Sequence, residues 1–289
     1  SLNVGENRFA LSIIMTINKK GYVESYDIFE SLICVAYKIT YKQITALFEG
    51  DSAFYKQKDL EKEYAEHLED IRLMRELAEV RHNMRYQRGA VDFEFPETHV
   101  TTDDNGKPID VAEDSVNFAN NIIEEFMLCC NKTLAEHVFW AQMPFVYRVH
   151  DVPDPEKLVK LGNFIRQFGF HLRTSSKRSV QNKHINALLS SCQGTNSQTL
   201  IETLAIRSMA KAVYSTSNIG HYGLAFTHYT HFTSPIRRYP DMMVHRLVAR
   251  YLLQSKATCR HDKEVLEEAC VHCSDTEQMA QMAERNSIK

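Results

Sequence analysis

The alternation of hydrophobic and polar positions predicts strands at the start of the chain and long helices after them. Residues 7–17 are rich in strand-forming side chains, a turn follows at 18–21, and 22–38 can return as a second strand. From residue 58 to 88, apolar side chains recur every three or four positions, which is typical of an amphipathic helix. Gly89 then ends this pattern.

Local start and stop signals predict further elements. A helix from Thr40 has a threonine cap and a glycine stop at Gly50, Asp154 followed by Pro155 starts another, and DDNG at 103–106 indicates a hairpin turn. Helical patterns also cover 115–137, 154–167, 180–192, 197–213, 236–254 and 262–289, with loops or extended segments at 144–149, 172–184 and 214–233. We therefore predict one domain over 1–289 with an α-rich, mixed α/β (α+β) fold, in which long helices surround an incomplete antiparallel sheet and a central cleft.

Composition narrows the class of protein only a little. The net charge of −3 gives no argument for nucleic-acid binding, although a basic channel can lie inside an acidic exterior. Seven irregularly spaced cysteines favour a reduced, cytoplasmic protein over a disulfide framework. The sequence contains neither an apolar run of membrane-spanning length nor a signal sequence, and its first residues read like a chain entered partway through a sheet.

The string THFTSPIRRYPDMMVHR at 230–246 carries the most chemistry. Ser234 can cap a helix whose first turn then holds Arg237 and Arg238, where the helix dipole disfavours cations. Two guanidinium groups beside unpaired helix amides form a strong phosphate site. Alternatively, Asp241 pairs with the arginines as a structural network. Pro240 should kink the helix or delay its start.

Other clusters have simpler interpretations. Cys270-x-x-Cys273, with Cys259, His261 and His272 nearby, suggests zinc, but the pair lies in a helical pattern without glycine and is better explained as buried thiols. His228 and His231 have no metal-binding spacing, which favours local packing or contacts beside a phosphate. A basic run is either a solvated loop or part of an RNA path; it consists of Arg173, Lys177, Arg178 and Lys183.

Several motifs in a fixed order resemble those of the RNase II/RNase R family of 3′-to-5′ exoribonucleases. FTSPIRRYPD followed by HR is similar to the signature of that catalytic domain. The sequence HFTSPIRRYPD resembles bacterial RNase R more than RNase II. The resemblance covers nearly the whole chain, through ITYKQI at 39–44, RGAVDFEF at 88–95, IIEEFMLCCN at 122–131, YRVHDVPDPEKL at 147–158, RSMAKAVYS at 207–215, HYGLAF at 221–226 and QMAERN at 281–286.

The resemblance implies a role for each matching residue. Arg237 would contact the scissile phosphate with Arg238 beside it, and Glu284 would shape the site around the last nucleotide. Phe93 would stack on the 3′-terminal bases. Tyr41 and Glu124 would read the ribose, with Glu125 as the alternative to Glu124. Taken singly, these residues would be interpreted as core, turn or solvated positions.

The family reaction is hydrolysis assisted by Mg²⁺ that a cluster of aspartates holds. This sequence lacks that cluster, because its one Asp-Asp pair, Asp103-Asp104, precedes Asn105-Gly106 and is typical of a turn. We therefore expect a C-terminal portion of the catalytic domain that is inactive alone, within a parent that needs Mg²⁺ and degrades RNA processively from single-stranded 3′ ends, with structured RNA as a further substrate. No membrane and no obligate protein partner are expected. The alternatives are a non-catalytic RNA-binding scaffold and, less well supported, a helical protein-interaction module.

Overall fold

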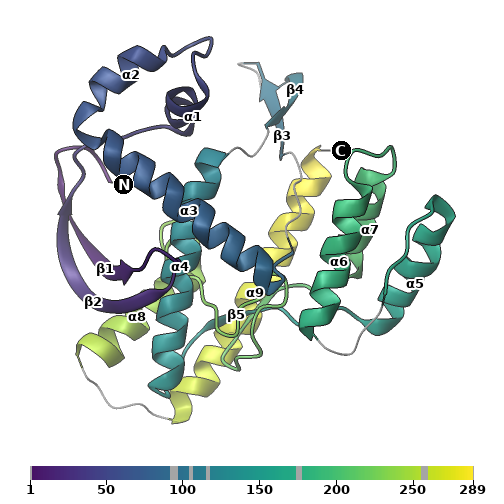
Figure 1. Ribbon diagram of the computed structural model, residues 1–289. Coiled ribbons are helices and arrows are strands. Elements are labelled where there is room, and N and C mark those ends of the chain that lie inside the picture. Colours follow the sequence, from purple (N-terminus) through teal and green to yellow (C-terminus); the bar gives the residue numbers. More distant parts are fainter. Residues whose placement is uncertain are drawn as a thin grey trace. The chain divides into compact units, whose positions relative to one another are not determined.

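The structure is a computed structural model that describes residues 2–91, 97–103, 107–114, 118–173, 178–254 and 260–288. Figure 1 shows the order of its elements along the chain. The strands are β1 (Asn7–Ile17), β2 (Val23–Cys34), β3 (Glu97–Thr102), β4 (Pro108–Asp114), β5 (Tyr147–Val149) and β6 (Val213–Ser215). The helices are α1 (Tyr41–Glu49), α2 (Gln57–Glu63), α3 (Leu68–Arg88), α4 (Phe118–Trp140), α5 (Pro155–Ile165), α6 (Arg178–Cys192), α7 (Gln198–Ser208), α8 (Tyr239–Leu247) and α9 (Arg260–Ile288). Short 3₁₀ turns cover Ala65–His67 and Arg166–Phe168, and a π-helical segment covers Val248–Leu253.

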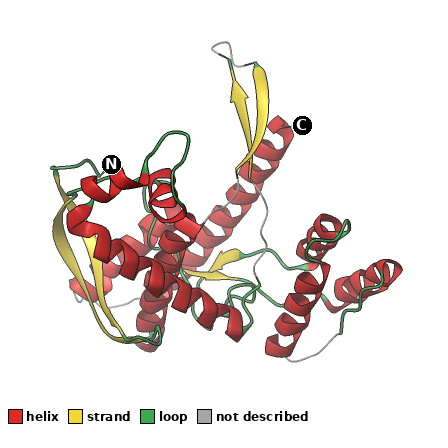
Figure 2. Cartoon of the chain, turned by 45° about the horizontal axis from the view of Figure 1, so that its top comes forward, coloured by secondary structure: helices red, strands yellow, loops and turns green. Residues whose placement is uncertain are grey.

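The predicted α-rich α+β class is confirmed. Helices dominate, and the described strands form separate two-stranded antiparallel ladders, β1–β2, β3–β4 and β5–β6, as Figure 2 shows in yellow. The chain divides into two compact units, one of residues 1–84 and 94–130 and the other of residues 85–93 and 131–289. The division falls within α3 and α4. The predicted single domain over 1–289 and the predicted central cleft stay predictions.

The first unit is built on the β1–β2 hairpin and helices α1 to α3. The hairpin turn needs Gly21, whose φ of +81° is left-handed and whose carbonyl accepts a 2.8 Å hydrogen bond from Arg81 Nη1 of α3. Thr40 caps α1 in a reciprocal pair with Gln43, as the sequence predicts. Buried side chains from α1 to α3 form a core that includes Leu47, Leu60, Tyr64 and Ile71.

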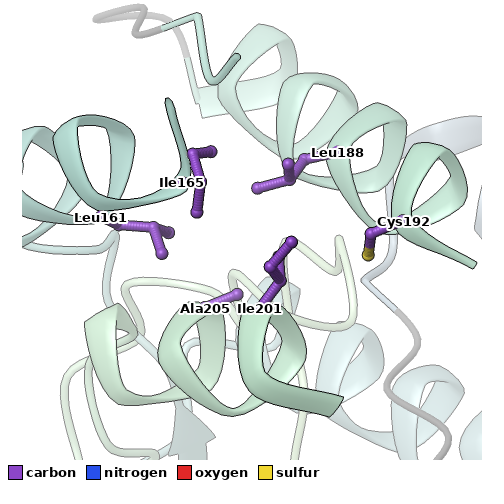
Figure 3. Close-up of a cluster of buried hydrophobic side chains, with 6 residues drawn as sticks. All are labelled: Leu161, Ile165, Leu188, Cys192, Ile201 and Ala205. Atoms are coloured by element: carbon purple, nitrogen blue, oxygen red, sulfur yellow. The ribbon is translucent and has the colours of Figure 1, made fainter. Parts of the chain in front are cut away.

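The second unit has its own core between α5, α6 and α7. Figure 3 shows side chains from the three helices pointing toward one another, among them Ile165, Cys192 and Ile201, which are fully buried. Asp154 starts α5 by accepting a hydrogen bond from Glu156 N at 2.8 Å, which confirms the predicted cap. This core anchors the helices that follow β5 in the chain.

A smaller platform of β5, β6 and α9 supports the segment that carries the arginines. Arg148 of β5 lies opposite Tyr214 of β6, and α9 lies along β6. Ser274 of α9 accepts a hydrogen bond from Tyr214 N at 2.9 Å, so the helix is fixed to the backbone of the ladder. The platform therefore joins three parts of the sequence that are far apart in the chain.

Some predicted boundaries are wrong. The pattern at 58–88 is not one helix, because it breaks at the buried Tyr64. Residues 209–213 are not helical, since the chain leaves α7 at Met209 to enter β6. The loop predicted over 172–184 ends at Arg178, where α6 begins. No helix in the described ranges is long and apolar enough to span a membrane.

Candidate functional site

The turn that carries Arg237 and Arg238 precedes helix α8. Ser234 O accepts hydrogen bonds from the backbone amides of Arg237 at 3.3 Å and Arg238 at 3.1 Å, and α8 begins only at Tyr239. The prediction that both arginines lie in the first helical turn is therefore wrong. Pro240 explains the late start, because its ring clashes with a helical carbonyl four residues earlier, so proline is tolerated only in a first turn.

Asp241 organises this turn. Its carboxylate is fully buried and accepts hydrogen bonds from Ser234 N and Arg238 Nη2, each at 2.8 Å. Arg238 Nε also lies 2.8 Å from Asp241 Oδ2. A carboxylate in the first turn of α8 is favourable for the helix dipole. The structural network that the sequence left open is thus present for Arg238.

Arg237 has a different environment from its neighbour. Its side chain is exposed, and within the described ranges it has no acidic partner. Ile236 beside it is 85% exposed, so the turn presents this residue pair outward. Arg237 is therefore the guanidinium that an incoming phosphate can reach, with both edges of the fork available for bidentate contact.

Buried polar groups hold the strand-like segment that leads into the turn. Phe232 N donates to Asn131 Oδ1 of α4 at 3.0 Å, and Phe232 O accepts from His245 Nε2 of α8 at 2.9 Å. The Phe232 and His245 rings also stack at 4.4 Å. Thr230 Oγ1, which is fully buried, donates to Val146 O. This rigid support fixes where Arg237 emerges, as a binding site requires.

His231 is a half-buried, neutral member of this support. Burial lowers its pKa to about 2, and the nearby guanidinium groups of Arg238 and Arg148 lower it further in the same direction. Its Nδ1 is hydrogen-bonded to Tyr214 Oη at 2.9 Å. The local-packing interpretation of His231 from the sequence fits this environment.

Glu284 lies on the exposed C-terminal part of α9. Ser287 Oγ donates to the Glu284 backbone carbonyl at 2.7 Å, and the carboxylate itself is solvent-accessible. The nearest buried positions of α9 are upstream, at Cys270, Cys273 and Ser274. The predicted site residues of the second unit are therefore an exposed Arg237, a half-buried Arg238 and an exposed Glu284.

The remaining site predictions fall in the first unit or outside the described residues. Tyr41 is the first residue of α1, and its ring is 45% exposed. Glu124 is exposed on α4, whereas its neighbour Glu125 is buried with Oε1 3.6 Å from His82 Nδ1. The structure thus separates these adjacent carboxylates, and the exposed one is the better placed to meet a ligand. Phe93 lies outside the described residues.

The side chains that the structure describes do not fit a metal site. Within the described ranges, no group of three or more histidine, cysteine, aspartate or glutamate side chains is placed to hold an ion. Asp103 Oδ1 accepts a hydrogen bond from Lys107 N at 2.8 Å, so this aspartate closes the β3–β4 turn as predicted. Cys270 and Cys273 are buried in α9, which agrees with the buried-thiol interpretation. Burial raises the pKa of Cys270 to about 12, so this thiol is protonated near neutral pH.

Sequence reasoning missed one pair of residues, Arg148 and Glu277. Arg148 donates from Nη1 and Nη2 to the two carboxylate oxygens of Glu277, at 2.7 and 3.1 Å. The available signal was a single arginine within the apolar extended segment PFVYRV, because a charged residue in such a segment is rarely buried without a partner.

Comparison with known proteins decides the family. The model of the RNB domain matches residues 1–254. This chain belongs to the RNB-domain family. Among curated RNB-domain relatives, ribonuclease R of Aquifex aeolicus is 36% identical over 288 residues, which cover 100% of this chain and 40% of that protein. The chain thus spans about two fifths of the length of this relative.

Solved structures show the same fold. Mycoplasma genitalium RNase R in complex with ribose-methylated single-stranded RNA has a TM-score of 0.87 and 24% identity, over 99% of this chain and 44% of that one. Its complex with double-stranded RNA gives the same TM-score and identity, over 99% of this chain and 50% of that one. Yeast Ssd1, described as a pseudonuclease, has a TM-score of 0.67 and 19% identity, over 94% of this chain and 32% of that one. At these identities the likeness concerns the RNB fold alone.

Proposed function

We propose that this chain is the C-terminal part of the catalytic domain of a ribonuclease R-like 3′-to-5′ exoribonuclease. The full-length enzyme hydrolyses RNA processively to nucleoside 5′-monophosphates. One observation carries the proposal: Arg237 is exposed in a turn that the buried Asp241 fixes, while the adjacent Arg238 is neutralised by that aspartate. An outward guanidinium on a rigid support is suited to contact a phosphate whose charge develops during hydrolysis.

The other residues complete the proposed contacts with RNA. Glu284 shapes the site around the last nucleotide, and Phe93 stacks on the 3′-terminal bases. Tyr41 and Glu124 read the ribose, since a phenol and a carboxylate both suit the 2′-hydroxyl as donor and acceptor. Arg238 assists Arg237 only through Nη1, because its Nε and Nη2 atoms face Asp241.

The proposed enzyme acts on single-stranded 3′ ends and depends on Mg²⁺. The Mycoplasma genitalium RNase R structures are complexes with single-stranded and with double-stranded RNA, which supports structured RNA as a further substrate. We propose that residues outside this chain bind the Mg²⁺, because the described residues contain no cluster of side chains that could hold it. This chain alone is accordingly proposed to be inactive. We also propose a reduced cytoplasmic location, because the cysteines that the structure describes form no disulfide; they are Cys34, Cys129, Cys130, Cys192, Cys270 and Cys273.

The chemical identity of the products tests this function. A protein of the relatives' full length that contains this segment is incubated with Mg²⁺ and either an RNA or a DNA of the same sequence. We expect nucleoside 5′-monophosphates from RNA and no products from DNA. Release of internal fragments, or equal cleavage of DNA, would contradict the proposal.

A second function is a non-catalytic RNA-binding scaffold. It is favoured by the lack of a metal cluster in the described residues and by the fold shared with a pseudonuclease. The same incubation discriminates the two functions, because a scaffold retains intact RNA in a complex and releases no nucleotide.

A further inference from the structure

Arg148 makes an ion pair that is largely withdrawn from solvent. The Arg148 side chain is 12% exposed and that of Glu277 is 32% exposed. The pair is bidentate: Arg148 Nη1 donates to Glu277 Oε2 at 2.7 Å, and Nη2 donates to Oε1 at 3.1 Å. Planar bidentate pairs fix the orientation of both partners as well as their separation. Because Arg148 lies on β5 and Glu277 on α9, the pair sets the position of the helix against the ladder.

The same arginine also contacts the segment that leads to Arg237. Its guanidinium carbon lies 4.5 Å from the centre of the Tyr214 ring, and the Tyr214 hydroxyl is hydrogen-bonded to His231. Its backbone amide donates to Tyr229 O at 2.9 Å. Residue 148 thus contacts the backbone of this segment directly, and its side chain contacts Tyr214, which binds the half-buried imidazole six residues before Arg237.

Helical periodicity links Glu277 to Glu284. The two residues are seven positions apart, which is close to two helical turns, so their side chains leave α9 on the same face about 10 Å apart. Residues 281–287 are all exposed, and Met279 and Met282 are more than half exposed. Because residues 281–287 are exposed, the contacts upstream of them determine where Glu284 points. Among the described residues, these contacts include the Arg148–Glu277 pair and the more exposed hydrogen bond from Lys211 Nζ to Gln278 Oε1 at 2.9 Å.

We infer that Arg148 is a positioning residue that fixes the positions of Glu284 and Arg237 relative to each other. This inference rests on the proposed function. The Arg148 side chain acts through Glu277 on α9 and through Tyr214 on the segment before the turn, and it does not itself contact RNA. Its loss leaves both site residues present but misaligned.

Steady-state hydrolysis by the full-length protein tests this role with the variants Arg148→Met, Arg148→Lys, Glu277→Gln and the double variant Arg148→Met/Glu277→Gln. We expect Arg148→Met to lower kcat by about 100-fold, as misplacement by about 1 Å does, with KM unchanged. Glu277→Gln should lower kcat in the same way, and the double variant should be no worse than Arg148→Met, because the two residues act as one unit. Arg148→Lys, which keeps the charge but not the fork, should recover part of kcat.

Lys132→Met is the matched control. It removes the Lys132–Glu136 pair, which has side chains 23% and 34% exposed but joins two positions of α4 only. All variants are assayed below the temperature at which any of them unfolds. Equal kcat values for Arg148→Met and Lys132→Met, or additive losses in the double variant, would overturn the inference while hydrolysis by the wild type still supports the proposed function. A wild type that leaves RNA intact would overturn both.

Discussion

Two neighbouring arginines with the same charge have different environments because of one buried carboxylate. Arg238 faces Asp241 through two nitrogen atoms, whereas Arg237 is exposed. The sequence left open whether the two arginines bind a phosphate or pair with Asp241 as a structural network. The helix begins two residues after Arg237, so only the nearer side chain reaches the carboxylate.

Substitution of the two arginines by alanine should therefore affect different properties, stability for Arg238 and RNA binding for Arg237. Arg238→Ala leaves the carboxylate of Asp241 buried with only the Ser234 amide, and we expect the free energy of unfolding to fall by about 2–4 kcal/mol. Arg237→Ala should change stability by less than about 0.5 kcal/mol but weaken RNA binding. Urea unfolding and RNA titration of both variants check this. Equal stability losses would show that the assignment of the ion pair is wrong.

The lowered pKa of His231 predicts that the protein becomes less stable in acid. Its folded-state pKa of about 2 lies below the ordinary value of 6.5. Between these two pH values, only the unfolded state binds the proton. The free energy of unfolding is therefore unaffected by the titration of His231 above pH 6.5, and it falls as the pH drops below 6.5, by up to about 1.4 kcal/mol per pH unit. In urea unfolding at pH 7 and pH 5, His231→Asn should lose less stability on acidification than the wild type. An unchanged pH dependence would contradict a His231 that stays neutral in the folded protein.

At the scale of elements, the sequence predicted those helices and hairpins whose signals are local. The Thr40 cap and the Asp154-Pro155 start each rest on contacts within a few residues, and both are found. Residues 104–106 of the predicted DDNG turn lie outside the described residues, but β3 and β4 pair on either side of it. The failures depend on distant contacts. Tyr64 is buried in the core of the first unit at the point where the predicted helix breaks. After α7 ends at Ser208, the chain turns extended so that Val213 pairs with Val149 of β5. Periodicity alone contains neither constraint.

The core between α5, α6 and α7 offers a matched pair of substitutions on one helix. Ile201 is fully buried and the adjacent Leu200 is 42% exposed. We expect Ile201→Ala to lower the free energy of unfolding by about 2–5 kcal/mol, because a buried cavity is left. Leu200→Ala should cost about 1 kcal/mol or less. Equal losses in chemical denaturation would show that α7 presents another face to its neighbours.

At the scale of the whole molecule, the predicted site residues are distributed over both compact units. Tyr41 and Glu124 belong to the first, and Arg237, Arg238 and Glu284 to the second. Their order and identity could be predicted from the family motifs, but Arg148 and Glu277 could not, because 129 positions separate these two partners in the chain. The net charge of −3 did not help either, since charge totals contain no information about where a single guanidinium is exposed.

Salt dependence of RNA binding tests the exposed arginine in the 289-residue chain itself. Each contact with a phosphate of single-stranded RNA adds about 0.7 to the slope of log K against log salt. Arg237→Ala should therefore reduce the slope by about that amount. Arg173→Ala, which removes another exposed arginine, should leave the slope unchanged if that side chain is only solvated. The reverse result would place the phosphate contact at Arg173.

The most direct test of the central claim is the direction of RNA shortening. A 5′-labelled RNA with a single-stranded 3′ tail is incubated with Mg²⁺ and either this chain, a full-length protein that contains it, or that protein with Arg237→Ala. We predict a ladder that shortens stepwise from the 3′ end with the full-length protein, a much slower ladder with Arg237→Ala, and intact RNA with this chain alone. RNA that the full-length protein binds but leaves intact would contradict the exoribonuclease assignment and support the scaffold in its place.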